Sequence, residues 1–532
     1  TYARNLAQLG QWAFIPGQPS AGSTSPLWSA LLSLGYLLNL APFAFTYFLG
    51  WLVILGISLL GMSLFNHLLP NQPLWSLAAG IFLALEWHLV WAAASGMETL
   101  LFSLLALATL TLLIKITPPL SKGGVGGDSS SKKTPPPLGG GRGGVFAPKP
   151  GWDSKRIKST PPLSKGGLGG DSSKNLPPPL GGGEGGVVFH SKGGVFFATG
   201  LLISLSVWLR PDGITLLAPA VLVALAVNPT WNSRSRSILL IGTGFALFFL
   251  PYLFFNQAIA GAWWPNTFYA KQAEYAVLRH LPLWQRFLDQ AFLPLVGAGA
   301  LLLPGFVYLC LQALKKRSWT LIAAILWFLG YLGIYALRLP VTYQHGRYVM
   351  PAMPVYFVLG LVGLTLYLDL RSSSSTVRIL SRVWVISLAL VLMAFWGIGA
   401  NAYGQDVAVI ETEMVTTAHW INSNTNFEDL IAAHDIGALG YFAKRPLLDL
   451  AGLVSPEVIP FIRDEAALAD YLDSQGAVYL VTFPDWYPQL TAQAELVYQT
   501  SGEISPLLGF ENMAVYRWPG ETQDINHQDH DE

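Results

Sequence analysis

The sequence predicts an all-α polytopic membrane domain with about ten spans, followed by a small C-terminal α/β domain outside the membrane. Of the 532 residues, 52% are hydrophobic and only 12% are charged, whereas soluble domains carry about 25% charged residues. Several apolar runs reach or approach the roughly 17–25 residues that a helix needs to cross a bilayer. The formal net charge is zero, so the composition does not indicate nucleic acid as a partner.

The predicted membrane elements begin after a first outer loop with short juxtamembrane helices, residues 1–45. Segment 26–40 in this loop is apolar but too short to cross, so we place it along the interface. Two later spans, 196–209 and 214–228, are also short, so the Arg-Pro-Asp-Gly turn at 210–213 should lie below the membrane surface. The candidate spans are 46–65, 74–94, 98–116, 196–209, 214–228, 237–256, 290–311, 319–337, 350–370 and 383–400.

The distribution of Lys and Arg predicts the orientation, because cytoplasmic loops carry an excess of these residues. The denser set of short loops is therefore predicted to be cytoplasmic, and it holds Arg234, Arg236, Lys315, Lys316, Arg317, Arg371, Arg378 and Arg382. The opposite loops are predicted to face the extracytoplasmic side, together with Glu98, residue 1 and the chain after 400, and they hold Arg210, Lys271, Arg279, Arg286, Arg338 and Arg347.

Residues 117–194 interrupt the membrane domain with a low-complexity segment. The run Thr-Pro-Pro-Leu-Ser-Lys-Gly-Gly at 117–124 recurs at 160–167, and Pro-Pro-Pro-Leu-Gly-Gly-Gly recurs in the same way. Such chain buries too little apolar surface to offset its ordering entropy. We therefore predict a disordered cytoplasmic insert between two membrane parts, 46–116 and 195–400, with a docking tail as the alternative.

The composition becomes that of a soluble domain beyond Asn401. The runs 430–434 and 478–481 are predicted as buried strands, and 407–422 and 464–474 as helices. Strands that alternate with helices indicate a small α/β domain over 401–519. The acidic residues 520–532 are predicted to form a disordered tail.

Polar residues at the outer ends of the spans are candidates for a site. Glu98 lies at the mouth of one span, and Glu86 and His88 lie near the outer end of the preceding span. Ionisable residues at that depth are costly and usually line a cavity, although interfacial snorkelling is the alternative. Arg210 suits a phosphate because its planar fork matches the phosphate oxygens, and an internal pair with Asp212 is the simpler reading of the same turn.

Two further outer loops combine aromatic and cationic groups. The segment 261–271 ends in Lys271 and suggests a platform for a sugar ring or a polyprenyl phosphate, or else an aromatic interface belt. The loop before span 350–370 holds His345, Arg347 and Tyr348, which could stabilise a phosphate leaving group. Membrane anchoring is the alternative for that loop.

Signals for other chemistry are weak or absent in the sequence. His434 and Asp435 follow a predicted strand, where a structural role is favoured over catalysis. We find no Walker loop, no paired metal-ligand spacing and no dinucleotide fingerprint after a strand. The single cysteine, Cys310, excludes an internal disulfide. No cofactor is assigned, and the need for a divalent cation stays open.

The motifs taken in order resemble bacterial membrane glycosyltransferases of the GT-C superfamily, with the closest likeness to the arabinofuranosyltransferase and protein-mannosyltransferase-like branch. The likeness covers most of the chain except the insert and the tail. Each motif alone is weak, but their order and shared sidedness are fairly specific. The matching segments are 2–6, 16–17, 24–28, 95–99, 210–213, 265–271, 346–348 with Pro351, and 434–437 with 449–453.

The resemblance implies an enzyme of the plasma (inner) membrane that works at its extracytoplasmic face. It would transfer a sugar from a polyprenyl-phosphate donor to a hydroxyl of a cell-envelope glycan, lipid or protein, with inversion. A carboxylate would deprotonate the acceptor, and cations would hold the lipid phosphate. The residues predicted to bind substrate are Tyr2, Arg4, Asn5, Glu98, Arg210, Asp212, Asn266, Tyr269, Lys271, His345, Arg347 and Tyr348.

The sequence departs from the family pattern at its start. The family's acidic pair, which supplies the catalytic base, and its first span would both precede Thr1. The chain thus resembles an N-terminally truncated member with one span fewer than the full-length form, and no catalytic base is named. A transporter or flippase for lipid-linked sugars is one alternative, although we see no repeated halves of the kind that transporters show. A catalytically inactive membrane scaffold is the other.

Overall fold

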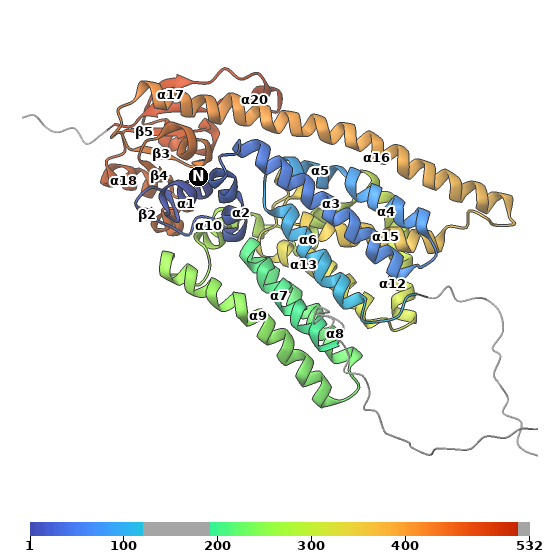
Figure 1. Ribbon diagram of the computed structural model, residues 1–532. Helices are drawn as coiled ribbons and strands as arrows, with labels where there is room; N and C mark the ends of the chain where they lie inside the picture. Colours follow the sequence, from blue (N-terminus) through green and yellow to red (C-terminus); the bar gives the residue numbers. More distant parts are fainter. Residues whose placement is uncertain (121–191, 520–532) are drawn as a thin grey trace, which may run out of the picture. The chain divides into compact units, whose positions relative to one another are not determined.

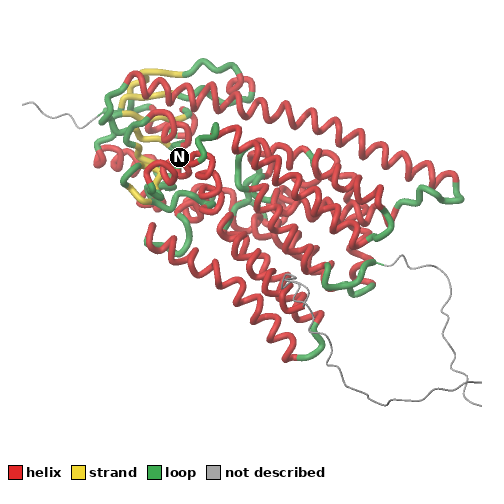
Figure 2. Tube along the Cα trace, viewed as in Figure 1, coloured by secondary structure: helices red, strands yellow, loops and turns green. Residues whose placement is uncertain are grey.

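The computed structural model describes residues 1–120 and 192–519 and is largely helical (Figures 1 and 2). Most of the predicted insert and the predicted tail lie outside these residues. Within the described chain, seven helices are long and apolar enough to cross a membrane, or eight if the bent pair α4 (Pro73–Leu85) and α5 (Trp87–Ala94) forms one span. Spans expected at 98–116 and 214–228 are shorter helices, so the polytopic membrane domain is confirmed with fewer full-length crossings.

The remaining membrane elements follow the expected order. Short 3-10 turns separate several of them, among them η2 (Pro211–Leu216), η3 (Ala276–His280), η4 (Leu293–Leu295), η5 (Gly297–Leu302) and η6 (Met350–Ala352). The helices are α3 (Pro42–Leu68), α6 (Thr99–Ile114), α7 (Lys192–Leu209), α8 (Leu217–Val227), α9 (Trp231–Ala260), α10 (Asn266–Glu274), α11 (Leu283–Phe292), α12 (Leu303–Lys315), α13 (Trp319–Arg338), α14 (Tyr343–Gly346), α15 (Met353–Tyr367) and α16 (Ser375–Val409).

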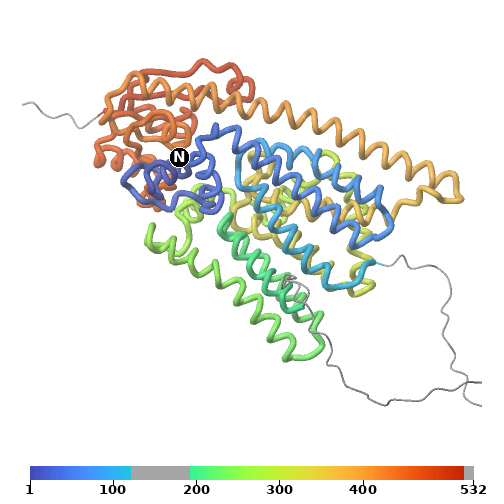
Figure 3. The backbone as a smooth tube through the Cα atoms, viewed as in Figure 1, coloured from blue at the N-terminus to red at the C-terminus, as the bar shows by residue number. Residues whose placement is uncertain are grey.

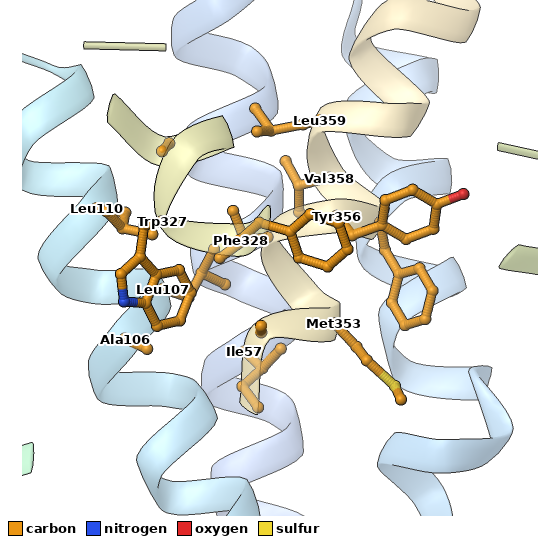
Figure 4. Close-up of a cluster of buried hydrophobic side chains, with 14 of the residues drawn as sticks. Ile57, Ala106, Leu107, Leu110, Trp327, Phe328, Met353, Tyr356, Val358 and Leu359 are labelled. Atoms are coloured by element: carbon orange, nitrogen blue, oxygen red, sulfur yellow. The ribbon is translucent and has the colours of Figure 1, made fainter. Parts of the chain in front are cut away.

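Helix α15 lies at the centre of the membrane domain and is buried along nearly its whole length. Side chains from α3, α6 and α13 pack around it, and Figure 4 shows Ile57, Leu107 and Trp327 in this cluster with Tyr356. Small residues allow the closest approach: a Cβ on Gly363 would lie 1.9 Å from the Gly305 carbonyl oxygen of α12. Helices in membranes commonly use small residues for such contacts.

Two predicted spans are interrupted in the structure. The span expected at 74–94 bends by 49° between α4 and α5, where Glu86 caps α5 by accepting a hydrogen bond from the Leu89 amide. The span expected at 290–311 begins instead at Gly297, because Pro294 and the positive φ of Gly297 break the helix before it. Ionisable and turn-forming residues inside an apolar run thus mark the breaks.

The boundary between the last span and the C-terminal domain also differs from the prediction. We expected a span at 383–400 and a separate helix at 407–422. The structure has one continuous helix over 375–424, in which α16 continues through the π-helical turn η7 (Ile410–Val415) into α17 (Thr416–Asn424). The intervening residues lack Pro, and their only glycine, Gly404, sits inside the helix, so nothing stops the helix at the change of composition.

The C-terminal domain is built on a five-stranded sheet with the order β4-β3-β5-β7-β6. The predicted strands are confirmed as β3 (Ile431–Ala433) and β5 (Tyr479–Thr482), which pair in parallel. Alternation along β3 sends Ala432 to one buried face and Ile431 and Ala433 to the other. The other elements are β4 (Leu447–Asp449), β6 (Glu495–Gln499), β7 (Ala514–Arg517), η8 (Leu439–Ala443), η9 (Pro456–Phe461), η10 (Pro484–Trp486), α18 (Glu465–Gln475), α19 (Pro488–Thr491) and α20 (Ile504–Leu507).

The N-terminal segment before α3 contacts the C-terminal domain although the two are far apart in sequence, as the chain colours in Figure 3 show. It consists of α1 (Tyr2–Leu9), the short antiparallel pair β1 (Ala13–Ile15) and β2 (Gln18–Pro19), and α2 (Pro26–Leu37). Arg4 donates to the carbonyl oxygens of Gly440 and Tyr441 and lies over the Tyr441 ring. The segment therefore joins the membrane helices to the domain.

Candidate functional site

Arg210 is the centre of a polar cluster at the ends of several apolar helices. It follows α7, and only 5% of the residue is exposed. Its Nε lies 3.2 Å from an Asp212 carboxylate oxygen, and its Nη1 lies 3.7 Å from Glu98. The predicted internal pair with Asp212 is therefore present, and Glu98 joins it from the start of α6.

Two tyrosines of α13 complete the surroundings of this pair. Tyr335 accepts a hydrogen bond from Arg210 at 2.7 Å and donates one to Asp212 at 2.6 Å. Tyr331 also donates to Asp212. Sequence reasoning missed both tyrosines, although hydroxyls at i and i+4 on one apolar span share a helix face and signal a polar partner there.

Arg347 and Tyr348 reach the same cluster from the loop before α15. Arg347 lies over the rings of Tyr343 and Tyr348, at 5.9 Å and 5.0 Å from their centroids. It donates to the Gln344 side-chain oxygen at 2.5 Å and contacts the Met97 sulfur at 3.5 Å, next to Glu98. The Arg210 guanidinium also lies 5.2 Å from the Tyr348 ring centroid.

We call this group the arginine cluster; it consists of Glu98, Arg210, Asp212, Tyr331, Tyr335, Arg347 and Tyr348. It joins loops that are up to 250 residues apart in the sequence. The loop candidates at 98, 210, 212, 347 and 348 thus meet in one place. Aromatic faces and two carboxylates hold the two guanidiniums in fixed orientations. Guanidinium N–H groups bind anions, so the two arginines are the groups of the cluster that could bind one.

Lys271 occupies a neighbouring position on α10. Its Nζ lies 2.8 Å from Glu274 and 5.6 Å from the Tyr275 ring centroid, and Tyr275 packs against Tyr343. Burial by itself would raise the pKa of Glu274, but hydrogen bonding to His434 and the charge of Lys271 outweigh it and lower this pKa from 4.5 to about 2. Lys271 therefore faces the arginine cluster as a cation that is already paired.

His434 holds this pair from the C-terminal domain. Its Nε2 lies 3.3 Å from Glu274, and its Nδ1 is 2.6 Å from the Tyr487 hydroxyl. Arg463 donates to the Glu274 backbone oxygen as well. His434 thus fixes the position of α10, which is a wider role than the structural one within its own domain that we expected.

Other candidates hold the N-terminal segment and the loop before α10 in place. Tyr2 bonds to Ser20 through its hydroxyl at 2.6 Å, and Asn5 donates to the carbonyl oxygens of Ala13 and Phe14. Asn266 donates to the Leu453 carbonyl oxygen at 3.2 Å. These residues and Arg4 therefore have structural partners outside the arginine cluster. Tyr269 is 39% exposed beside Phe268.

His345 is separated from its neighbours in the sequence. Its Nε2 lies 2.9 Å from Asp406 of α16, and Asp406 also accepts a hydrogen bond from the Trp91 indole at 2.8 Å. The predicted group of His345, Arg347 and Tyr348 is therefore divided between two places. Glu86 and His88 are fully buried and bonded to each other at 2.8 Å, so they do not snorkel to the interface.

Within residues 1–120 and 192–519, no three or more His, Cys, Asp or Glu side chains are placed to hold a metal ion.

Comparison with known proteins places this architecture among solved structures. Over 97% of this chain and 91% of the other, the fold matches apo ArnT from Cupriavidus metallidurans with a TM-score of 0.53 and 14% identity. The same protein bound to undecaprenyl phosphate matches with a TM-score of 0.52 and 14% identity over 97% and 92% of the two chains. The chain has the GT-C fold.

The predicted architecture of a multi-pass membrane protein with a small C-terminal α/β domain is thereby confirmed. An oligosaccharyltransferase from Archaeoglobus fulgidus also matches, with a TM-score of 0.49 and 13% identity over 91% of this chain and 63% of the other. In sequence, residues 400–518 match the family described as Domain of unknown function (DUF8728). No curated protein matches the chain.

Proposed function

We propose that this GT-C protein transfers a glycosyl group from a polyprenyl-phosphate sugar to an acceptor hydroxyl at the extracytoplasmic membrane face. The observation that carries the proposal is the arginine cluster, in which Arg210 and Arg347 lie together at the ends of apolar helices. A polyprenyl-phosphate sugar has the matching chemistry, an apolar tail and an anionic head. ArnT, which shares the fold, has been solved with undecaprenyl phosphate bound.

The chemistry of transfer explains why cations are needed. The acceptor oxygen forms a bond to the anomeric carbon while the bond from that carbon to the phosphate oxygen breaks, and the electron pair leaves with the lipid phosphate. A carboxylate takes the acceptor proton. A single displacement of this kind inverts the anomeric centre. Guanidiniums fixed where the phosphate charge develops stabilise the transition state without reorganising.

The two arginines have different roles in this proposal. Arg210 is held by Asp212, Glu98 and Tyr335, so its fork is preorganised before substrate binds. Arg347 pairs with neutral groups, the Gln344 amide oxygen and the Met97 sulfur. Its charge is therefore the less compensated of the two, and we assign it the main contact with the departing phosphate.

A transporter for lipid-linked sugars fits less well. Transporters place their polar site near mid-membrane between repeated halves, whereas the polar groups here gather at the loops on one side of the helices. The sidedness is itself part of the proposal, because it rests on the Lys and Arg distribution.

Substitution of Arg347 tests the donor site. We expect Arg347→Ala to lower transfer from a panel of polyprenyl-phosphate sugars by about 100-fold, the loss typical of removing one transition-state donor, while the protein still inserts and folds. Arg338→Ala is the matched control, because Arg338 is exposed and its side chain donates a long hydrogen bond to Gln272 at 3.4 Å, away from the arginine cluster. If Arg347→Ala kept wild-type turnover, Arg347 would not contact the donor phosphate.

Labelling from each side of the membrane tests the orientation. In a Cys310→Ser background, single cysteines at Ser95, Thr342 and Ser373 would be reacted with a membrane-impermeant maleimide. We expect positions 95 and 342 to react from the extracytoplasmic side and position 373 from the cytoplasmic side. Reaction of 95 and 342 from opposite sides would contradict a shared site.

A further inference from the structure

A cavity of about 430 Å³ lies beside the arginine cluster, within the range of about 300–1,000 Å³ that small-molecule sites occupy. The loop 342–348 separates the two: Gln344 lines the cavity and accepts a hydrogen bond from Arg347. The polar and aromatic side chains that line the cavity include Trp87, His88, Tyr343, Gln344, His345 and Asp406.

The polar groups of this cavity are held in place by aromatic rings. The His345 ring meets Trp87 and Trp91 edge to face, at centroid distances of 5.3 Å and 5.0 Å. His345 pairs with Asp406, and their side chains remain 25% and 40% exposed. Gln344 and His345 both have positive φ angles of 50° and 56°. This backbone conformation is unfavourable for a non-glycine residue and persists only where the surroundings impose it.

The charge of the cavity differs from that of the arginine cluster. Among the described residues that line it, none is Lys or Arg, and Asp406 brings a carboxylate. A phosphate would be repelled there. A hydroxylated head suits these groups instead, because a carboxylate accepts hydrogen bonds while an amide and an imidazole both donate and accept them.

An apolar groove adjoins the cavity and shares Trp87 with it. One wall is α5, with Val90, Trp91 and Ala94, and the other is α16, with Trp396 and Ala400. The surface of the groove is almost wholly apolar, and the span of α16 is mostly exposed, as a helix that faces lipid would be. The groove therefore suits an alkyl chain that enters from the bilayer.

We propose that the cavity and groove bind the acceptor as a glycolipid, with its sugar head against His345 and Asp406 and an alkyl chain between α5 and α16. The assignment rests on the proposed glycosyl transfer and extends it to the acceptor. It places an acceptor hydroxyl next to the donor phosphate, with the loop 342–348 serving both. It also assigns His345 to the acceptor rather than to the phosphate.

Photolabelling with a simple glycolipid tests this assignment. The probe is dodecyl β-glucoside carrying a diazirine on the alkyl chain, used with the full chain in phosphatidylcholine nanodiscs, and labelled peptides are located by mass spectrometry. We expect labelling in Trp87–Ala94 and in the part of α16 around Trp396. Unlabelled dodecyl β-glucoside should compete, whereas dodecyl phosphate and undecaprenyl phosphate should not.

Variants of the polar groups separate head recognition from partition into the groove. Asp406→Ala and His345→Gln should each weaken competition by dodecyl β-glucoside about ten-fold, as expected for the loss of a hydrogen bond that involves a charged group. Asp289→Ala is the matched control, an exposed aspartate of α11, and should compete as the wild type does. Melting temperatures of all variants would confirm that they fold.

Several results would overturn the proposal. Labelling spread over the lipid-facing helices without competition would show no site, and competition by undecaprenyl phosphate would assign the groove to the donor. Equal competition by dodecyl β-glucoside in wild type and Asp406→Ala would show that the sugar head does not bind in the cavity. Failure of the proposed donor site can be told apart from failure of the acceptor site. It would appear as unchanged transfer in Arg347→Ala, while labelling by the glucoside probe stayed as in the wild type.

Discussion

The arginine cluster and the neighbouring cavity use the same loop but differ in how their charges are compensated. In the cluster, Arg210 is 5% exposed and contacts two carboxylates and a tyrosine hydroxyl. In the cavity, the pair of His345 and Asp406 keeps a quarter or more of each side chain in contact with solvent. Buried charges depend on their partners for stability, whereas exposed ones are stabilised by water. Stability and ligand binding should therefore respond differently to substitution in the two places.

The largest effect is expected from Arg210→Met, which removes the cation from the buried group. Breaking a buried ion pair by removing one partner costs about 3–5 kcal/mol, because Asp212 and Glu98 are left uncompensated. Thermal unfolding in detergent would measure the loss. The double variant Arg210→Met with Asp212→Asn should recover part of it. If Arg210→Met had the same melting temperature as the wild type, solvent would have to reach the cluster.

A smaller loss of stability is expected from Glu274→Gln. It tests whether Lys271 and Glu274 form a buried ion pair, as Arg210 and Asp212 do. The pKa of Glu274 is lowered from 4.5 to about 2 in the folded protein, so its ionised form contributes stability above pH 4.5 that is lost as the pH falls toward 2. The contribution is at most about 3 kcal/mol. Wild type should melt above Glu274→Gln at pH 7, and the difference should shrink at pH 3.5. A constant difference across this range would contradict the ionised pair.

The next largest loss of stability is expected from Tyr335→Phe. Loss of the hydroxyl removes a bond to Asp212 and one from Arg210, and hydrogen bonds to charged groups contribute about 1.5–3 kcal/mol. Tyr356→Phe is the matched control, because its buried hydroxyl donates to the neutral Gly299 carbonyl, and loss of that bond should cost about 1 kcal/mol. Equal losses in melting temperature would argue against a charged network at Asp212.

The smallest effect on stability is expected from Asp406→Ala. Its ion pair with His345 is partly exposed, and exposed pairs contribute up to about 1 kcal/mol. The melting temperature should therefore change little, although competition by the glucoside should weaken about ten-fold. Asp212→Ala, measured in parallel, should be clearly more destabilising. A comparable loss in both variants would show that the cavity is as closed as the cluster.

Sequence reasoning placed Glu98, Arg210, Asp212, Arg347 and Tyr348 on one membrane side, and the structure brings them into contact. It missed the tyrosines of α13, because a hydroxyl in an apolar helix does not reveal which loop will face it. It also grouped His345 with Arg347 from their proximity in the sequence. The positive φ angles at Gln344 and His345 turn these side chains apart. Such angles are uncommon in residues other than glycine, even though His adopts them more often than most, so the turn was not predicted.

The sequence by itself determined which parts of this protein lie in lipid and which lie in water. Long apolar runs must lie in lipid, and alternating short strands after Asn401 must build a sheet outside it, because burial of apolar surface is a property of composition and period. The tertiary structure alone decided which loops share a site and which charges compensate one another. Those contacts depend on how distant helices pack around α15, and interactions across hundreds of residues leave no local signal in the chain.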